Sequence, residues 1–146
     1  MTHLASLVKY LLDASALYPL ILRLRQDLSL YRGQIAVLDL TVYEVGNAIW
    51  KEHRRGTIKH PAPVVRMFEE IMKGMERLSI GLGMLEAFDI AAKNNVTFYD
   101  ASYIYVARKE GLKLVTEDSG LLRFSEAITL EEMLKELKLR PAPKLP

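Results

Sequence analysis

Four acidic residues lie where the sequence predicts that a buried strand ends or a helix begins, and they are the candidates for chemistry. They are Asp13, Glu44, Asp100 and Asp118. Because the carboxyl ends of parallel strands share one edge of a sheet, we expect these acids to meet there. Carboxylates that converge in this way repel each other unless a divalent cation compensates their charge. Oxygen ligands without His or Cys are typical of Mg²⁺ or Mn²⁺ sites, so the pattern predicts a hard divalent cation.

The same acids also fit a structural role as helix caps. The spacing Thr-x-x-acid, typical of a capping box, occurs three times: at Thr41 and Glu44, at Thr97 and Asp100, and at Thr129 and Glu132. Taken singly, Glu44 and Asp100 are therefore interpreted as caps, and the third pair as purely structural. Asp13 and Asp118 fit an N-cap and a metal ligand equally well. The convergence of all four acids is what favours a metal.

Short apolar strands and longer helices alternate along the chain and must position these acids. Strands are predicted at residues 9–12, 35–38, 112–115 and 127–129, and helices at 14–30, 42–55, 63–75, 84–95, 98–110 and 131–138. Residues 78–83 fit either a connection or a short extended piece. The helix after Asp100 is almost wholly apolar between Ala101 and Ala107, so it should be buried on most of its circumference, and Gly111 should end it. We interpret Met72 and Met75 as core residues. The pattern predicts an α/β fold of three layers, with a mostly parallel central sheet flanked by helices.

Composition sets the remaining limits. The 146 residues, half of them hydrophobic, suit a single domain, predicted at residues 1–139, with a flexible proline-containing tail at 140–146. The absence of Cys excludes disulfides and thiolate chemistry, and a net charge of +2 gives no strongly basic field. Lys9 and Asp13 interrupt the N-terminal apolar run, and no other segment could cross a bilayer. We therefore expect a cytoplasmic protein without a membrane partner.

Four segments together resemble the PIN-domain family, and most closely its VapC-type toxin ribonucleases from toxin–antitoxin pairs. Residues 11–17 resemble the family's strand-end Asp followed by Ser or Thr, and residues 41–48 resemble its helix-borne Glu with a downstream Asn. Residues 99–103 and 114–118 resemble its most specific part, a Tyr-Asp-Ala helix followed by a Leu-Val-Thr-x-Asp strand end. Each motif alone is weak, but the four occur in the family's order between residues 9 and 132.

The resemblance implies a metal-dependent endoribonuclease that uses Mg²⁺ or Mn²⁺. Asp13, Asp100 and Asp118 would hold the ion directly or through water, and Glu44 would complete the acidic site. Thr116 would position the Asp118 loop or a water, although its role as a β-branched strand residue explains it equally well. The bound ion would activate a water for in-line attack on a phosphodiester. The implied partners are an RNA substrate, a cognate antitoxin that covers the site, and a second copy in a homodimer.

A basic run downstream of Glu44 is the candidate for holding the RNA backbone. Its members proposed for this role are Lys51, Arg54 and Arg55. Cations also favour helix C-termini, so a solvated helix end is the preferred interpretation of this run. Two further acids are left outside the site, Glu117 as an auxiliary or solvated neighbour and Asp39 as a cap or strand terminator. The alternative function is a non-catalytic PIN-fold module that binds RNA or protein, which the presence of all four acids disfavours.

Overall fold

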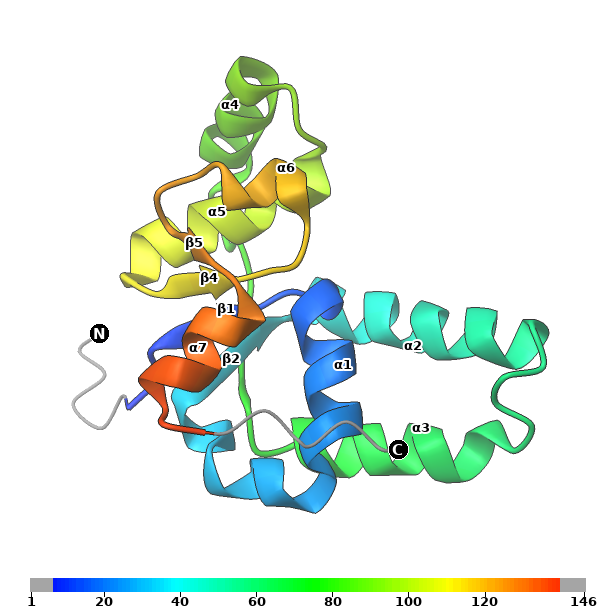
Figure 1. The fold of residues 1–146 in the computed structure, drawn as a ribbon. Coiled ribbons are helices and arrows are strands. Elements are labelled where there is room, and N and C mark those ends of the chain that lie inside the picture. Colours follow the sequence, from blue (N-terminus) through cyan, green and yellow to red (C-terminus); the bar gives the residue numbers. More distant parts are fainter. Residues whose placement is uncertain (1–6, 140–146) are drawn as a thin grey trace.

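A parallel sheet forms the centre of the molecule, and the computed structural model describes residues 7–139 (Figure 1). Within these residues the sheet has five strands in the order β3-β2-β1-β4-β5, every neighbouring pair parallel. They are β1 (Tyr10–Leu12), β2 (Ile35–Leu38), β3 (Glu76–Leu78), β4 (Lys113–Val115) and β5 (Ala127–Ile128). The tail predicted at residues 140–146 lies outside the described residues.

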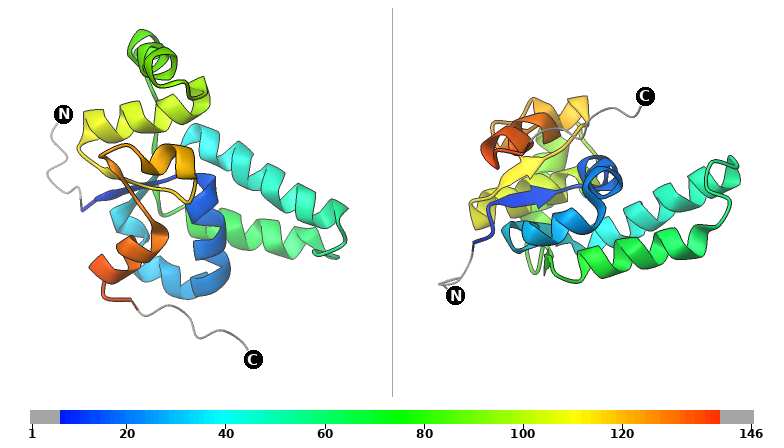
Figure 2. Two further views of the ribbon diagram at one scale, coloured as in Figure 1. Left: turned by 45° about the horizontal axis from the view of Figure 1, so that its top comes forward. Right: turned by 60° about the horizontal axis from the view of Figure 1, so that its bottom comes forward.

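Helices cover both faces of this sheet and make the three predicted layers. They are α1 (Ala14–Leu24), α2 (Asp39–Arg54), α3 (Pro61–Met72), α4 (Met84–Asn94), α5 (Phe98–Glu110), α6 (Ser119–Leu122) and α7 (Leu130–Glu136), with 3₁₀ turns η1 (Arg25–Leu30) and η2 (Arg32–Gln34). The buried clusters place α1, α3 and α7 against one face, and α5 and α6 against the other. The α2–α3 pair projects from this body, and α4 packs on the outer side of α5 (Figures 1 and 2).

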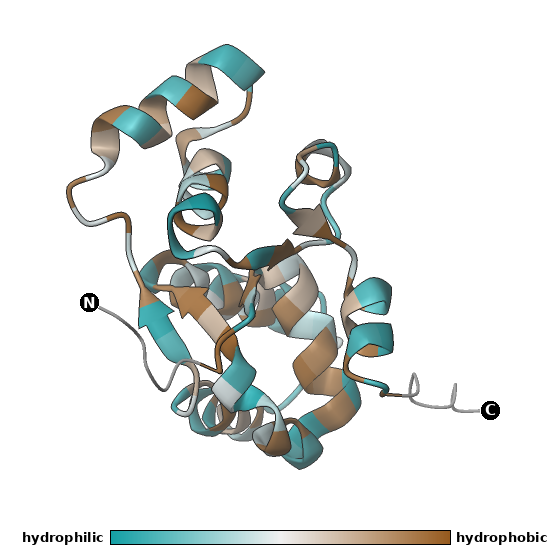
Figure 3. Ribbon diagram, turned by 90° about the vertical axis from the view of Figure 1, so that its left-hand side faces the viewer, coloured by the Kyte–Doolittle hydropathy of each residue, from teal (hydrophilic) through white to brown (hydrophobic). Residues whose placement is uncertain are grey.

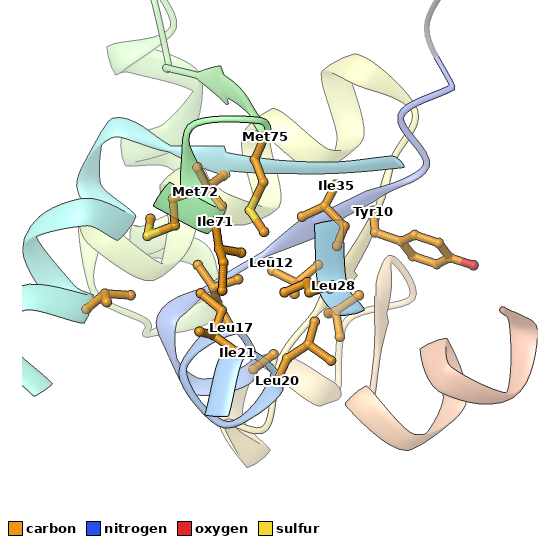
Figure 4. Packing of buried hydrophobic residues seen from close by; sticks show 14 of the residues in the cluster. Tyr10, Leu12, Leu17, Leu20, Ile21, Leu28, Ile35, Ile71, Met72 and Met75 are labelled. Carbon is orange, nitrogen blue, oxygen red and sulfur yellow. The ribbon is translucent and has the colours of Figure 1, made fainter. Parts of the chain in front are cut away.

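Alternation along the strands explains why the inner strands β1 and β2 are apolar at every position, whereas the edge strand β3 carries Glu76 and Arg77. Leu12 belongs to the cluster under α1, which Figure 4 shows around Leu17 and Ile71, whereas Leu11 belongs to the cluster under α5. Successive side chains of a strand point to opposite faces, and both faces of this sheet are covered. Figure 3 shows both hydrophobic and hydrophilic segments on the strands of the sheet.

Several details of the predicted elements are confirmed. Helix α5 is buried at six of the seven positions from 101 to 107, and Gly111 ends it in the left-handed conformation at φ 69°. Both Met72 and Met75 are buried in the core. In the described part of the chain, no helix is long and apolar enough to span a bilayer.

The structure corrects three predicted helices. The helix predicted at residues 63–75 spans Pro61–Met72. The helix predicted at residues 14–30 ends at Leu24, because Arg25 takes a left-handed φ of 48° and the chain continues in η1, which buries Leu28 and packs against α3. The helix predicted from residue 42 begins at Asp39. Helix α6 was not predicted at all.

Candidate active site

Three neighbouring strand ends and one helix start bring the four acids to the carboxyl edge of the sheet. Asp13 directly follows the central strand β1, Asp118 follows β4, and Glu44 lies on α2 just after β2. Asp100 reaches the same edge because α5 leads into the parallel strand β4 and therefore begins where β4 ends. Each of the four carboxylates has an electrostatic interaction with at least one of the others.

Asp13 is the most deeply buried of these acids, with 6% of its surface exposed. Its Oδ1 accepts hydrogen bonds from Ser15 Oγ at 2.6 Å and from Ala16 N at 3.2 Å, and its Oδ2 accepts one from Thr116 Oγ1 at 2.6 Å. Asp13 is therefore the N-cap of α1, as the structural interpretation expected. An ionised carboxylate offers about four lone pairs, so three donors leave room for one further ligand on Oδ2.

Two hydroxyl groups tie the loop after β4 to the start of α1. Thr116 is fully buried, and its Oγ1 accepts a hydrogen bond from Asp118 N at 3.0 Å while donating to Asp13. Ser15 Oγ accepts from Glu117 N at 2.9 Å and lies 3.3 Å from Thr116 Oγ1. Ser15 was missed as a site residue, although its place two residues after a strand-end Asp was the available signal.

Glu44 is held by a residue that the sequence analysis also missed. Tyr103 on α5 donates its hydroxyl proton to Glu44 Oε1 at 2.5 Å, and the same hydroxyl lies 2.7 Å from Thr41 Oγ1. Thr41 accepts a hydrogen bond from Leu38 N at 3.0 Å. The capping box predicted at Thr41 and Glu44 is therefore wrong, because α2 begins two residues before Thr41 and Glu44 lies beyond its first turn. A tyrosine on a helix predicted to be mostly buried was the available signal, since a buried hydroxyl needs a partner.

The two remaining acids lie at helix starts. Thr97 caps α5 by accepting a hydrogen bond from Asp100 N at 3.0 Å, which places Asp100 in the first turn. Asp118 caps α6, with its Oδ1 accepting from Gly120 N at 2.8 Å. Between residues 7 and 139, Oδ2 of Asp118 and Oε2 of Glu44 have no hydrogen-bond partner, so capping or anchoring occupies only one oxygen of each.

The electrostatics of the site leave its negative charge uncompensated. Burial raises the pKa of Asp13, and the hydrogen bonds from Ser15 and Thr116 counteract part of this rise. Burial also raises the pKa values of Glu44 and Asp100, and the neighbouring acids raise both further. None of the ion pairs formed among residues 7–139 involves any of the four.

This donor set fits a hard divalent cation by chemistry and charge. It consists only of carboxylate oxygens that repel one another, which is the set that Mg²⁺ and Mn²⁺ prefer. As the side chains stand, no group of three or more acidic or histidine residues in the described ranges is arranged to hold a metal. Asp13, Glu44 and Asp118 are instead turned toward their own hydrogen-bond donors.

The other candidates lie outside this group. Lys51, Arg54 and Arg55 are at the far end of α2, where Arg54 lies 5.3 Å from the Trp50 ring centroid and Arg55 pairs with Glu52 at 2.7 Å. At a rise of 1.5 Å per residue, the helix carries Arg54 about 15 Å beyond Glu44.

Glu117 and Asp39 take structural positions. Glu117 Oε2 accepts a hydrogen bond from Leu130 N at 3.0 Å and so satisfies the start of α7. Asp39 is exposed, begins α2 and accepts a hydrogen bond from Leu40 N at 2.9 Å. The capping box predicted at Thr129 and Glu132 is confirmed.

Comparison with known proteins agrees with this architecture. The PIN domain family model matches residues 10–127. The chain is 40% identical over 131 residues to exonuclease VapC9 of Pyrobaculum aerophilum, and the match covers 89% of this chain and 96% of that relative. It is 34% identical over 122 residues to ribonuclease VapC3 of the same organism, and this match covers 78% of this chain and 92% of that relative. Its fold matches the crystal structure of PAE2754 from P. aerophilum with a TM-score of 0.80 at 40% identity, covering 90% of this chain and 97% of that one. A toxin–antitoxin complex from Klebsiella pneumoniae matches with a TM-score of 0.62 at 16% identity, covering 84% and 98%. The chain therefore belongs to the PIN-domain family, as a relative of its VapC proteins.

Proposed function

We propose that this protein is an endoribonuclease that depends on Mg²⁺ or Mn²⁺ and acts as the toxin of a toxin–antitoxin pair in the cytoplasm. The observation that carries the proposal is the meeting of Asp13, Glu44, Asp100 and Asp118 at one sheet edge, where residues 7–139 provide no paired cation. A repelling cluster of this kind lowers stability, which a purely structural role does not explain. The names of the two VapC relatives, an exonuclease and a ribonuclease, support a nuclease.

Each residue has a defined task in this proposal. Asp13, Asp100 and Asp118 would hold the ion, directly or through water, and Glu44 would complete its surroundings. When bound, the ion supplies a water of lowered pKa and neutralises charge that develops on the phosphate. Thr116 keeps Asp13 and the Asp118 backbone in fixed relation through its two hydrogen bonds.

The basic residues of α2 would hold the RNA backbone beside this site. On a helix of 100° per residue, Lys51 and Arg55 lie seven and eleven residues after Glu44 and so return to within about 20° of its side. Arg54 is rotated from Glu44 by about 80° and lies over Trp50. We therefore assign phosphate binding chiefly to Lys51 and Arg55, and a smaller share to Arg54.

An exposed apolar segment at the start of α4 would join two copies of the chain. Its large apolar side chains are all more than half exposed, namely Leu82, Met84, Leu85 and Phe88. Contiguous exposed apolar surface of this kind marks protein interfaces. Light scattering should give a dimer mass for the wild type and a monomer mass for Leu85→Lys with Phe88→Lys, whereas a monomeric wild type would contradict this assignment.

The antitoxin would bind the groove between α2 and α3. This groove has a volume of about 440 Å³ and a mainly apolar lining that includes Val42, Ile49, Val65 and Phe68. The likeness to a solved toxin–antitoxin complex supports a protein partner. Replacing the exposed Val65 by Lys should weaken capture of the cognate antitoxin on co-expression, and unchanged capture would exclude the groove.

A cleavage assay tests the proposed activity and its mode. Purified protein would be incubated with linear and circular single-stranded RNA of one sequence, and with the matching DNA, in Mn²⁺ or in EDTA. An endoribonuclease opens the RNA circle in Mn²⁺ only and spares DNA. Cleavage of the linear form alone would establish an exonuclease, as the name of the first relative suggests for that protein. No cleavage by folded protein would favour the non-catalytic binding module.

A further inference from the structure

A buried tyrosine and threonine contact the acidic site without adding a carboxylate to it. Tyr103 is 1% exposed and Thr41 is fully buried. The Tyr103 hydroxyl lies between Glu44 Oε1, at 2.5 Å, and Thr41 Oγ1, at 2.7 Å, and Thr41 Oγ1 lies 3.0 Å from Leu38 N. A continuous chain of hydrogen bonds thus runs from the end of β2, across to α5, and back to Glu44 on α2.

Counting protons fixes the direction of this chain. The Leu38 N–H can only donate, so Thr41 Oγ1 accepts at that end. An ionised Glu44 can only accept, so Tyr103 gives its single hydroxyl proton to Oε1. The Tyr103 oxygen must then accept from Thr41, whose single proton is available for that bond. All three donors therefore point toward Glu44, and successive bonds in such a chain polarise one another.

Glu44 needs an anchor more than the three aspartates do. Its longer side chain loses more conformational entropy when it is fixed. Asp13 and Asp100 repel it electrostatically. Without a donor at Oε1, the carboxylate would turn outward to solvent. The anchor occupies Oε1 and leaves Oε2 without a hydrogen-bond partner in the described part of the chain.

We propose that Tyr103 and Thr41 are positioning residues that hold Glu44 beside the three aspartates, with Oε2 left available to the divalent cation or its water. This inference rests on the proposed function in one respect, namely that the site binds a divalent cation. When a residue that does not touch the metal orients a metal ligand by a hydrogen bond, removing that bond typically lowers metal affinity about 10- to 100-fold. The Tyr103 ring also fills the core, so only its hydroxyl is assigned this role.

Single-atom variants separate positioning from packing. Tyr103→Phe removes the hydroxyl and keeps the ring, and Thr41→Val removes the relay that Thr41→Ser retains. Tyr105→Phe is the matched control, because Tyr105 lies on the same helix but its ring contacts Lys109, at 5.9 Å, rather than an acid of the site. Each folded variant would be titrated with Mn²⁺ by calorimetry, and its thermal midpoint would be recorded without metal.

We expect Tyr103→Phe to weaken Mn²⁺ binding at least about 10-fold, Thr41→Val to weaken it less, and Thr41→Ser and Tyr105→Phe to bind as the wild type does. Equal Mn²⁺ affinity of Tyr103→Phe and wild type, or equal losses in Tyr103→Phe and Tyr105→Phe, would overturn the inference. A crystal structure of metal-free Tyr103→Phe gives a second readout, in which the Glu44 carboxylate should have turned outward. If the wild type binds no Mn²⁺, the proposed function fails. The crystal structure of Tyr103→Phe still tests the inference in that case, because a Glu44 carboxylate that has not moved would contradict the positioning role of Tyr103.

Discussion

Thr116 Oγ1 donates a hydrogen bond of 2.6 Å to Asp13 Oδ2 and so joins two residues that are 103 positions apart in the chain. The same oxygen accepts a hydrogen bond from Asp118 N at 3.0 Å. One buried hydroxyl therefore links the carboxylate that follows β1 to the backbone of the acid that follows β4. The distance between two of the proposed metal ligands depends on this residue.

Replacing Thr116 by Val should destabilise the protein and damage the site together. Val has nearly the same shape but leaves the buried Asp13 carboxylate without one donor and Asp118 N without its acceptor. An unmade hydrogen bond of this kind costs about 1–3 kcal/mol, which urea denaturation can measure. Thr116→Ser keeps the hydroxyl and should retain most of both properties. Equal stability of the Val and Ser variants would show that Thr116 acts only by packing.

The metal-free protein should lose stability at the site as pH rises. The pKa values of Asp13, Glu44 and Asp100 are raised in the folded state, first of all by burial. Above pH 4 the folded state therefore binds more protons at these groups than the unfolded state, and their contribution to the free energy of unfolding falls until the raised pKa values are passed. Asp100→Asn removes one of these groups. Its stability relative to the wild type should rise between pH 4 and pH 7, and urea denaturation showing a constant or falling difference would contradict this explanation.

Mn²⁺ should stabilise the folded wild type, because the cation binds a cluster that the unfolded chain lacks. Free ion at 100 times its dissociation constant adds about 2.7 kcal/mol to the free energy of unfolding. The thermal midpoint should rise accordingly and return to its starting value on addition of EDTA. Asp100→Asn should show a much smaller rise, and a rise equal to that of the wild type would place the ion elsewhere.

Salt dependence should distinguish the basic residues of α2. Each lost phosphate contact lowers the slope of log affinity against log salt by about 0.7 for a single strand. Lys51→Ala with Arg55→Ala should therefore flatten the slope of RNA binding by about 1.4, measured by fluorescence anisotropy. Arg54→Ala, on another side of the helix, is the matched comparison. If Arg54→Ala alone produced the larger change, the assignment to the Glu44 side of α2 would be wrong.

The sequence was sufficient to predict most strands and helices, though not β3 or α6, and the edge where the acids meet. Short runs such as residues 35–38 are apolar throughout because both sheet faces are covered, and strand ends followed by Asp13 and Asp118 mark the carboxyl edge. The two ends of α5 could also be predicted from neighbouring residues, because Thr97 caps its start and Gly111 takes the positive φ that ends it.

The contacts that hold the acids in place could not be predicted, because they join distant segments. Thr41 fits a capping box by spacing, yet its hydroxyl is used by Leu38 N and Tyr103, a residue 62 positions away. Arg25 carries no Gly or Pro signal for the break of helix 14–30, which follows from the packing of η1 against α3. Ser15 and Tyr103 lay within the motifs that were noticed, but only the tertiary structure brings their hydroxyls to the carboxylates.

The most direct measurement is the rate of RNA cleavage in Mn²⁺ by the wild type, Asp100→Asn and Asp39→Asn. Asp39 is the matched control, because it also follows a strand but is exposed, and within the described part of the chain it accepts a side-chain hydrogen bond only from Leu40 N. The proposed site predicts that Asp39→Asn cleaves like the wild type, that Asp100→Asn has lost cleavage, and that EDTA stops the active forms. Cleavage by Asp100→Asn at the wild-type rate would contradict the acidic site as the centre of activity.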